Sequence, residues 1–430
     1  MISNAKRLIN TISKSTSPFH TTVEAINQLQ SAGFEELLWD TDWCLVPGNK
    51  YYITPFNTTL FAFKINAEFN KEDIIKIAAA HIDNPGLRIK ANPEYFQDNY
   101  MKVNTEVYGG AILSTWFDRP LSIAGRIFLK GETHATPKMV LVDFKKPLLM
   151  IPNLSIHMNR SVNDGIALNN QIDMIPIAGN TSNKDNDKHF ITDLIANKLN
   201  VATAEILSYE LCVYNCEQGC IAGFNDEFIM APRIDNISSV QACLSGIIES
   251  NRTNGIDLIA LFDHEEVGSR SKNGAASNLL PFVLERIYNK LDVNREDYLK
   301  SVLKGFFLSL DVAHATNPNH PEKYDITSGV KINDGITLKS TSKQNYCGDG
   351  ETNAMLQSLA KEYNIPFVVN YLRSDSTGGS TLGSMLSSVL PMRCADLGAP
   401  IFAMHSAMET MGVSDQYNLE KFTQVFFTSL

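Results

Sequence analysis

The sequence predicts an α/β protein in which a domain with a central mixed sheet is interrupted by an inserted β-rich domain. Its length, a set of short apolar runs and a change of pattern in mid-chain support this prediction. The chain has 430 residues, of which 44% are apolar and 20% charged, a composition typical of soluble globular proteins. This length exceeds one ordinary core and favours two domains, or one large domain with an insertion.

Five continuous apolar runs of strand length predict the central sheet. Runs of this kind are typical of strands buried on both faces. Helical patterns at residues 238–249 and 353–363 lie between some of them, and alternating strands and helices indicate an α/β sheet. The five runs are residues 74–80, 228–234, 256–262, 306–310 and 401–404.

The pattern changes between about Pro93 and Pro232. Short alternating runs such as SIAGRIFLK and KMVLVDF stand there between turn-like stretches, which is typical of β structure. We therefore expect residues 1–92 and 233–430 to form the α/β domain and residues 93–232 to form the insertion.

Shorter segments give further expectations. Residues 21–33 predict a helix, in which Val23, Ile26 and Leu29 recur on one side. The polar residues 182–189 predict an exposed loop. The first residues contain no apolar stretch of signal-peptide length, and no run reaches the ~18 apolar residues that a membrane span needs.

Charge and cysteine content narrow the class of protein. The chain carries 37 basic and 47 acidic residues, a net charge of −10, which argues against nucleic acid or an anionic membrane as a main partner. Seven cysteines without a disulfide pattern indicate a reducing compartment, and we expect a cytoplasmic protein. Cys212, Cys216 and Cys220 are evenly spaced, but they lack a fourth ligand, so we predict that they hold no zinc.

A potential metal ligand stands at the end of each of the five apolar runs. In open α/β sheets, ligands bind beyond the carboxyl ends of the strands. If the five strands share one sheet, these side chains therefore meet at one edge. The residues are His81, Asp235, Glu265 with Glu266, Asp311 and His405.

Each of these residues also has an ordinary structural explanation. His81 can be a core histidine, and Asp235 can cap the helix that follows it. The adjacent carboxylates of Glu265 and Glu266 are different, because they follow a buried strand beside Asp263 and repel one another. A nearby cation would relieve this repulsion, which favours a functional role for the pair.

Taken together, the residues fit a co-catalytic zinc site. Zinc binds histidine nitrogen and carboxylate oxygen, and a catalytic zinc keeps one position open for water. Two ions ~3.5–4 Å apart need a bridging carboxylate. The set contains two histidines, one bridging and two terminal carboxylates, and a spare glutamate that can act as general base. Asp83 lies two residues after His81, where it can orient the histidine ring.

These residues occur in segments that resemble the aspartyl aminopeptidase family, metallopeptidase family 18. The resemblance begins at TSPFH near the start of the chain, covers nearly all of it and keeps the family's order. The further segments are AHIDNPGLRIK (80–90), EVYGG (106–110), TWFDRPLSIAGR (115–126), EFIMAPRIDN (227–236), DHEEVGS (263–269), SLDVAHATNPN (309–319), GGSTLG (378–383) and DLGAPIFAMHSAMET (396–410).

The resemblance implies a zinc-peptidase fold and an enzyme that removes residues from the N-termini of peptides. It implies two Zn²⁺ ions per subunit, with Mn²⁺ or Co²⁺ as substitutes, and Asp83 as the support of His81. The ligands implied in this sequence are His81 and Asp311 for one ion, Glu266 and His405 for the other, and Asp235 as the bridge, with Glu265 as the general base.

The resemblance also implies an assembly, a tetrahedral dodecamer whose active sites face an interior chamber. Residues 1–92 and 233–430 would be the catalytic domain, and residues 93–232 would be an oligomerisation domain. His157, in LSIHMNR, would reach a neighbouring subunit's pocket and touch substrate there, or would be a metal ligand. A surface histidine of the insertion is the alternative.

Substrate choice is the least defined expectation. Lys343 matches the family segment that supplies a cation, which an acidic first residue needs. The stretches 345–350 and 373–375 depart from the family pattern, so neutral or hydrophobic first residues remain an alternative.

Two other classes of protein remain. A di-zinc carboxypeptidase or deacylase would recognise a substrate carboxylate with an arginine near the site. A shell protein without catalysis would have lost ligands or the base, all of which are present in this chain.

Overall fold

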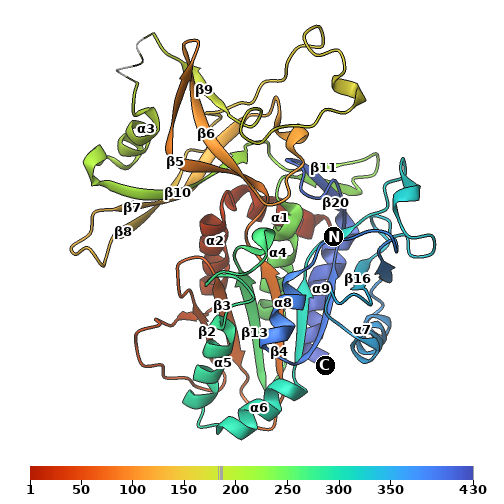
Figure 1. The fold of residues 1–430 in the computed structure, drawn as a ribbon. Coiled ribbons are helices and arrows are strands. Elements are labelled where there is room, and N and C mark those ends of the chain that lie inside the picture. The colour runs from red at the N-terminus through yellow and green to blue at the C-terminus, as the bar shows by residue number, and fades with distance from the viewer. Residues whose placement is uncertain (183, 185–186, 430) are drawn as a thin grey trace.

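The computed structural model describes residues 1–182, 184 and 187–429. Figure 1 shows a large α/β part and, beyond one end of it, a second part built mainly of β-strands. The β-rich part interrupts the α/β part in the sequence, so the predicted fold class is confirmed. None of the helices in the described residues is long and apolar enough to cross a membrane.

A nine-stranded mixed sheet forms the centre of the α/β part. Three of its strands, β13, β4 and β14, lie side by side and run parallel. The order across the sheet is β1 (Glu35–Glu36), β2 (Lys50–Ile53), β3 (Leu60–Ile65), β13 (Ile256–Phe262), β4 (Ile75–His81), β14 (Phe306–Leu310), β18 (Arg393–Gly398), β16 (Ile336–Ser340) and β17 (Phe367–Tyr371).

Helices cover both faces of this sheet, so its central strands are buried on both sides as predicted. In β13, Ile259 and Leu261 face one apolar core, whereas Leu258 and Ala260 face the other. The first core contains α1 (Ile2–Lys14), α2 (Pro18–Ser31), α4 (Ile234–Glu249), α7 (Gly350–Glu362) and α9 (Val413–Ser429). The second contains α5 (Leu279–Lys290), α6 (Arg295–Lys304) and α8 (Leu382–Val389).

Two of the five predicted strands lie outside this sheet, so the expectation of one shared sheet is wrong. They belong to a small sheet with the order β11 (Cys220–Ala222), β12 (Phe228–Ala231), β20 (Glu409–Gly412), β19 (Pro400–Phe402) and β15 (Ala313–His314). The run at 228–234 stops being a strand because Arg233 has a left-handed backbone and α4 begins at the next residue. β15 and β19 directly follow β14 and β18, so the small sheet still lies at the carboxyl ends of the central strands.

The β-rich part is an antiparallel sheet of six strands with its own apolar core. Its order is β8 (Lys138–Asp143), β7 (Leu121–Leu129), β10 (Ile206–Asn215), β5 (Gly86–Gln97), β6 (Tyr100–Tyr108) and β9 (Ile177–Asn180), and α3 (Phe190–Leu199) packs against it. Strand β5 runs through residue 93, and the predicted division at residues 93–232 stays a prediction. Residues 183, 185 and 186 of the predicted loop at 182–189 lie outside the described residues.

The first predicted helix differs in its start and in its buried face. α2 begins at Pro18 because the Ser17 side chain caps it and proline suits the first helical position. Val23, predicted on the apolar side, is 41% exposed, whereas Ala25 and Leu29 are fully buried. Ile26, also predicted on that side, packs against the first core, so the predicted face is correct for Ile26 and Leu29 and wrong for Val23.

Candidate metal centre

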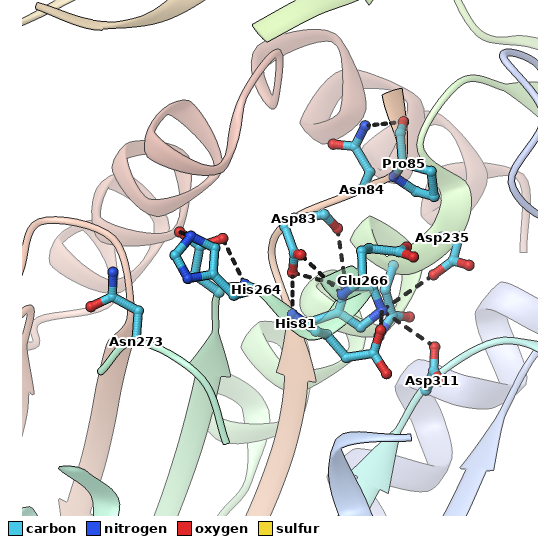
Figure 2. Close-up of polar contacts among 12 residues, drawn as sticks. His81, Asp83, Asn84, Pro85, Asp235, His264, Glu266, Asn273 and Asp311 are labelled. Atoms are coloured by element: carbon cyan, nitrogen blue, oxygen red, sulfur yellow. Dashed lines mark hydrogen bonds and ion pairs between the residues drawn. The ribbon is translucent and has the colours of Figure 1, made fainter. Parts of the chain in front are cut away.

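The five predicted ligands gather around a cavity of about 330 Å³ at the carboxyl ends of the central strands. Figure 2 shows four of them, from four different segments, pointing toward one another. His81 ends β4, Glu266 lies in a short helical turn after β13, Asp311 follows β14, Asp235 lies at the start of α4, and His405 lies between β19 and β20.

The His81 ring presents one nitrogen to the cavity. Its Nδ1 lies 3.0 Å from the Asp83 carbonyl oxygen and 3.4 Å from the Asp83 carboxylate, so Nδ1–H donates there. Its Nε2 lies 3.3 Å from Asp235 Oδ1 and 3.5 Å from Asp311 Oδ1. An imidazole whose Nδ1 proton is held by an acceptor has its Nε2 lone pair free for a metal.

The His405 ring is arranged in the same way. Its Nδ1 lies 3.0 Å from the Gly110 carbonyl oxygen, and its Nε2 lies 3.5 Å from both Asp235 Oδ2 and Glu266 Oε2. A Cβ at position 110 would stand 3.2 Å from His405 Nδ1. The glycine in EVYGG thus lets the backbone approach the ring closely enough to orient it.

Asp235 lies between the two rings and turns one carboxylate oxygen to each. Its Oδ1 and Glu266 Oε1 are buried and have no hydrogen-bond partner in the protein, an arrangement that is costly unless something else satisfies them. The ligand atoms of His81, Asp235 and Glu266 lie within 4.8 Å of one another. These residues fit a metal. The N-cap position of α4 is held by Arg233 and not by Asp235.

The electrostatics of the cluster favour an added cation. Burial, followed by the neighbouring carboxylates, raises the pKa of Glu265 to about 8 and that of Glu266 well above its usual range. Burial alone would lower the pKa of His81, but the surrounding carboxylates, which can accept from the protonated ring, raise it. Burial likewise opposes ionisation of Asp311, but Lys339, 3.2 Å away, and His81 lower its pKa. The cluster thus holds more acidic groups than its own cations neutralise.

Comparison with known proteins identifies the family. A family model described as aminopeptidase I zinc metalloprotease (M18) matches residues 11–427. The chain belongs to the M18 family. A probable M18 family aminopeptidase 2 of Clostridium novyi (strain NT) is 41% identical to it over 424 residues, 98% of each chain. This M18 protein is therefore a metallo-type hydrolase that acts on peptides.

Solved structures with the same fold are consistent with this family assignment. The structure of an Ape4 and Nbr1 complex matches this M18 chain with 30% identity and a TM-score of 0.93, covering 99% of this chain and 85% of that one. The structure of a Saccharomyces cerevisiae mApe1 dodecamer matches with 25% identity and a TM-score of 0.82, covering 98% and 96%.

Asp83 positions more of the M18 site than the sequence suggested. Besides its contact with His81, its carboxylate accepts the backbone N–H groups of Glu265 and Glu266, each at 3.1 Å. It also accepts the Tyr108 hydroxyl at 2.8 Å. One fully buried aspartate thereby fixes a histidine ring and the turn that carries both glutamates. Tyr108 lies in the EVYGG segment, but the motif alone does not indicate this role.

Two further residues of the site were missed. Glu409 accepts the backbone N–H of Asp235 at 3.0 Å and that of His405 at 2.7 Å, so it holds two separate segments together. Lys339 lines the cavity, and its ammonium donates to Asp311 Oδ2 and to the Val312 carbonyl oxygen. The sequence offers little indication of Lys339 beyond its being the one charged residue of the short strand ITLKS, β16.

The structure does not bring the two predicted substrate residues into this cavity. Lys343 lines an adjoining cavity of about 390 Å³, which shares Tyr346 with the first, and its Nζ donates to the Ser376 carbonyl oxygen. His157 is exposed in the β-rich part. Cys212 is buried and Cys220 is exposed, and among the described residues no cysteine belongs to a group that could hold a metal.

Proposed function

We propose that this M18 protein is a two-zinc aminopeptidase that removes residues from the N-termini of peptides. The observation that carries the proposal is the position of Asp235, whose two oxygens face two imidazoles with open Nε2 atoms. His81 and Asp311 would hold one ion, and His405 and Glu266 the other. Zinc bound there would supply a Lewis acid for the scissile carbonyl and would lower the pKa of water.

The protein's own groups then divide the remaining work. Glu265 lines the cavity and is placed to take a proton from the attacking water and return it to the leaving amine. Asp83 holds the turn that carries Glu265 at its backbone N–H, which keeps the carboxylate at a constant position. The pKa of about 8 that burial confers on Glu265 would fall toward the operating pH beside cations, as a general base requires.

The first-residue preference that we propose is acidic. Lys339 is the one lysine among the residues that line the described cavity, and Lys343 lies in the cavity beside it. The neutral or hydrophobic alternative is supported by Met385 and Met404, which also line the cavity. No arginine is among the cavity's described lining residues, which argues against a carboxypeptidase.

We further propose a homo-oligomer, with the tetrahedral dodecamer as its form and the β-rich part as a contact region. Leu154, Ile156 and Met158 are 66%, 49% and 77% exposed on either side of His157. Such an apolar stretch on a single subunit favours burial against another copy. That contact would carry His157 toward a neighbouring site.

A panel of short peptides tests the proposal. C-terminally amidated peptides should lose their first residue, whereas N-terminally acetylated peptides should remain intact. A chelator should abolish release, and Zn²⁺, Mn²⁺ or Co²⁺ added back should restore it to different extents. Release of the last residue from acetylated peptides would instead identify a carboxypeptidase, and no hydrolysis with zinc bound would favour the shell protein.

A further inference from the structure

Two cysteines lie on neighbouring segments next to the wall of the cavity. Cys347 follows Tyr346, which lines the cavity, and Cys394 is the second residue of β18. The side chains of the two cysteines influence one another's ionisation, and hydrogen bonds of the surrounding backbone fix the place of Cys347 against β18.

The backbone holds this pair together. The Asp396 N–H donates to the Cys347 carbonyl oxygen at 3.2 Å, and the Cys347 N–H donates to the Asp396 carboxylate at 2.5 Å. A Cβ at position 348 would stand 3.4 Å from the Cys394 carbonyl oxygen, so the chain after Cys347 lies directly against β18. The backbone therefore holds residues 347 and 394 side by side, which is the arrangement that a disulfide requires.

We propose that Cys347 and Cys394 form a redox modification site, a reversible disulfide beside the catalytic cavity. Cys347 is buried, and Cys394 is partly exposed, so a small oxidant reaches Cys394 first. The neighbouring Cys347 side chain lowers the pKa of Cys394, against the opposing effects of burial and of Asp396. A lowered pKa increases the fraction of thiolate, which is the reactive form.

The reaction is balanced with hydrogen peroxide as the oxidant. The Cys394 thiolate attacks one peroxide oxygen, the O–O bond breaks, and the departing hydroxide takes up a proton as water, which leaves a sulfenic acid. The Cys347 sulfur then attacks the sulfenic sulfur and forms the S–S bond. The sulfenic hydroxyl leaves with the thiol proton as a second water. Two thiols are oxidised, one peroxide is reduced, and a dithiol reductant reverses the change.

The disulfide would act on the cavity through the segment that contains Cys347. Tyr346 is the preceding residue, and its ring lies 5.3 Å from the Lys339 ammonium. Asp349 caps α7 two residues further on. Drawing Cys347 toward Cys394 therefore displaces a residue of the cavity wall. This consequence rests on the proposed function, and a displacement of this kind should lower kcat/KM by about tenfold or more.

The test uses the full-length, zinc-loaded protein. After mild peroxide treatment, free thiols are alkylated and peptides are mapped by mass. We expect a cross-linked peptide joining residues 347 and 394, which disappears with dithiothreitol. The same peptide should be absent from Cys394→Ser and present in the control Cys44→Ser, whose thiol is exposed. The wild-type measurement alone already decides whether the bond forms, even if the variants fold poorly.

Activity assays complete the test. The kcat/KM of the oxidised wild-type protein should fall and recover with reductant, whereas that of Cys394→Ser should not respond to peroxide. Recovery of Cys394 as a sulfinic acid without a cross-link would overturn the proposal. A cross-link with unchanged kinetics would overturn the effect on the cavity. An inactive reduced enzyme would contradict the proposed function, but the peptide map would still decide the disulfide.

Discussion

The two ends of strands β4 and β13 both bury charged groups, but they do so in opposite ways. At the amino ends, Asp257 pairs across the sheet with Lys64 and Lys76. It also accepts Arg252 at 3.0 Å and Asn66 at 3.2 Å. The ammonium of Lys76 donates to two backbone carbonyl oxygens at the end of α9. Every one of these side chains has a partner within the protein.

At the carboxyl ends, some buried hydrogen-bond acceptors are left without donors. Asp235 Oδ1 and Glu266 Oε1 are buried and have no hydrogen-bond partner in the protein. Glu409 and Asp83 bind backbone N–H groups of the ligand-bearing segments, so these ligands keep their positions without a metal. The cluster at the amino ends thus completes its own hydrogen bonds, as a structural cluster does, whereas the cluster at the carboxyl ends presents preorganised, unsatisfied acceptors.

The largest expected effect comes from removing the proposed base. Glu265→Gln should lower kcat by about 100- to 10,000-fold, the range for general acid–base catalysis, because the amide cannot take up the proton. Zinc content should be unchanged, since Glu265 is not among the proposed ligands. Turnover and metal analysis on one preparation measure both, with the exposed surface change Glu296→Gln as control. Near-normal turnover would refute the assignment of the base.

The next largest effect should come from loosening Asp83, which holds His81 and the turn with both glutamates in position. Tyr108→Phe removes the hydroxyl that Asp83 accepts and keeps the ring that packs on Arg88. Activity or zinc affinity should fall by about 10- to 100-fold, as is typical for partners of metal ligands. Tyr209→Phe is the matched control, because its hydroxyl donates to the Lys90 carbonyl oxygen in the six-stranded sheet. Equal losses in both variants would indicate a general loss of stability instead of a positioning role.

A smaller effect, on substrate preference, should show which of two lysines binds an acidic first residue. Lys339→Gln should reduce the ratio of kcat/KM for glutamyl over alanyl first residues by about tenfold, the value of one charge-assisted hydrogen bond. Lys343→Gln should change it less, because Lys343 lies in the adjoining cavity. Measuring the ratio cancels general losses of activity. A larger change for Lys343 would restore the assignment made from sequence.

The smallest effect lies at the other end of the sheet and concerns stability. Burial, with Arg252 as a further cause, lowers the pKa of Lys76 from 10.5 to about 7. The unfolded chain therefore binds more protons than the native protein between these pH values, so stability should rise with pH across this window. Lys76→Met should flatten that rise by up to about 1.4 kcal/mol per pH unit.

Urea unfolding at several pH values and one protein concentration measures the slope. The exposed Lys361→Met is the control and should keep the wild-type slope. Identical slopes for wild type and Lys76→Met would show that Lys76 stays protonated in the folded protein.

The sequence predicts those features of the fold and site that depend on residues close together in the chain. The apolar runs of β4, β13 and β14 are continuous, so His81, Glu266 and Asp311 could be placed at strand ends before the structure was known. The small sheet could not be separated from the central one, because a run such as 228–234 has the same composition whichever sheet it joins. Its position after β14 and β18 nevertheless brought Asp235 to the same edge.

The supporting residues could not be predicted in the same way. Glu409 acts on two backbone N–H groups far away in the sequence, and no spacing within its own segment indicates them. Lys339 and Lys343 are four residues apart, but β16 ends at Ser340, and the two lysines therefore line different cavities. Such pairings depend on tertiary contacts, which a single sequence does not encode in any periodic pattern.

The spread of the cluster along the chain has a consequence for biosynthesis. Its side chains come from positions between His81 and His405, and a ribosome delivers them in that order. A nascent chain that lacks the loop after β19 has only one of the two imidazoles, together with an incomplete small sheet. Peptidase activity should therefore appear in a single step late in synthesis. Incomplete chains should then be unable to hydrolyse other nascent chains on the same polysome.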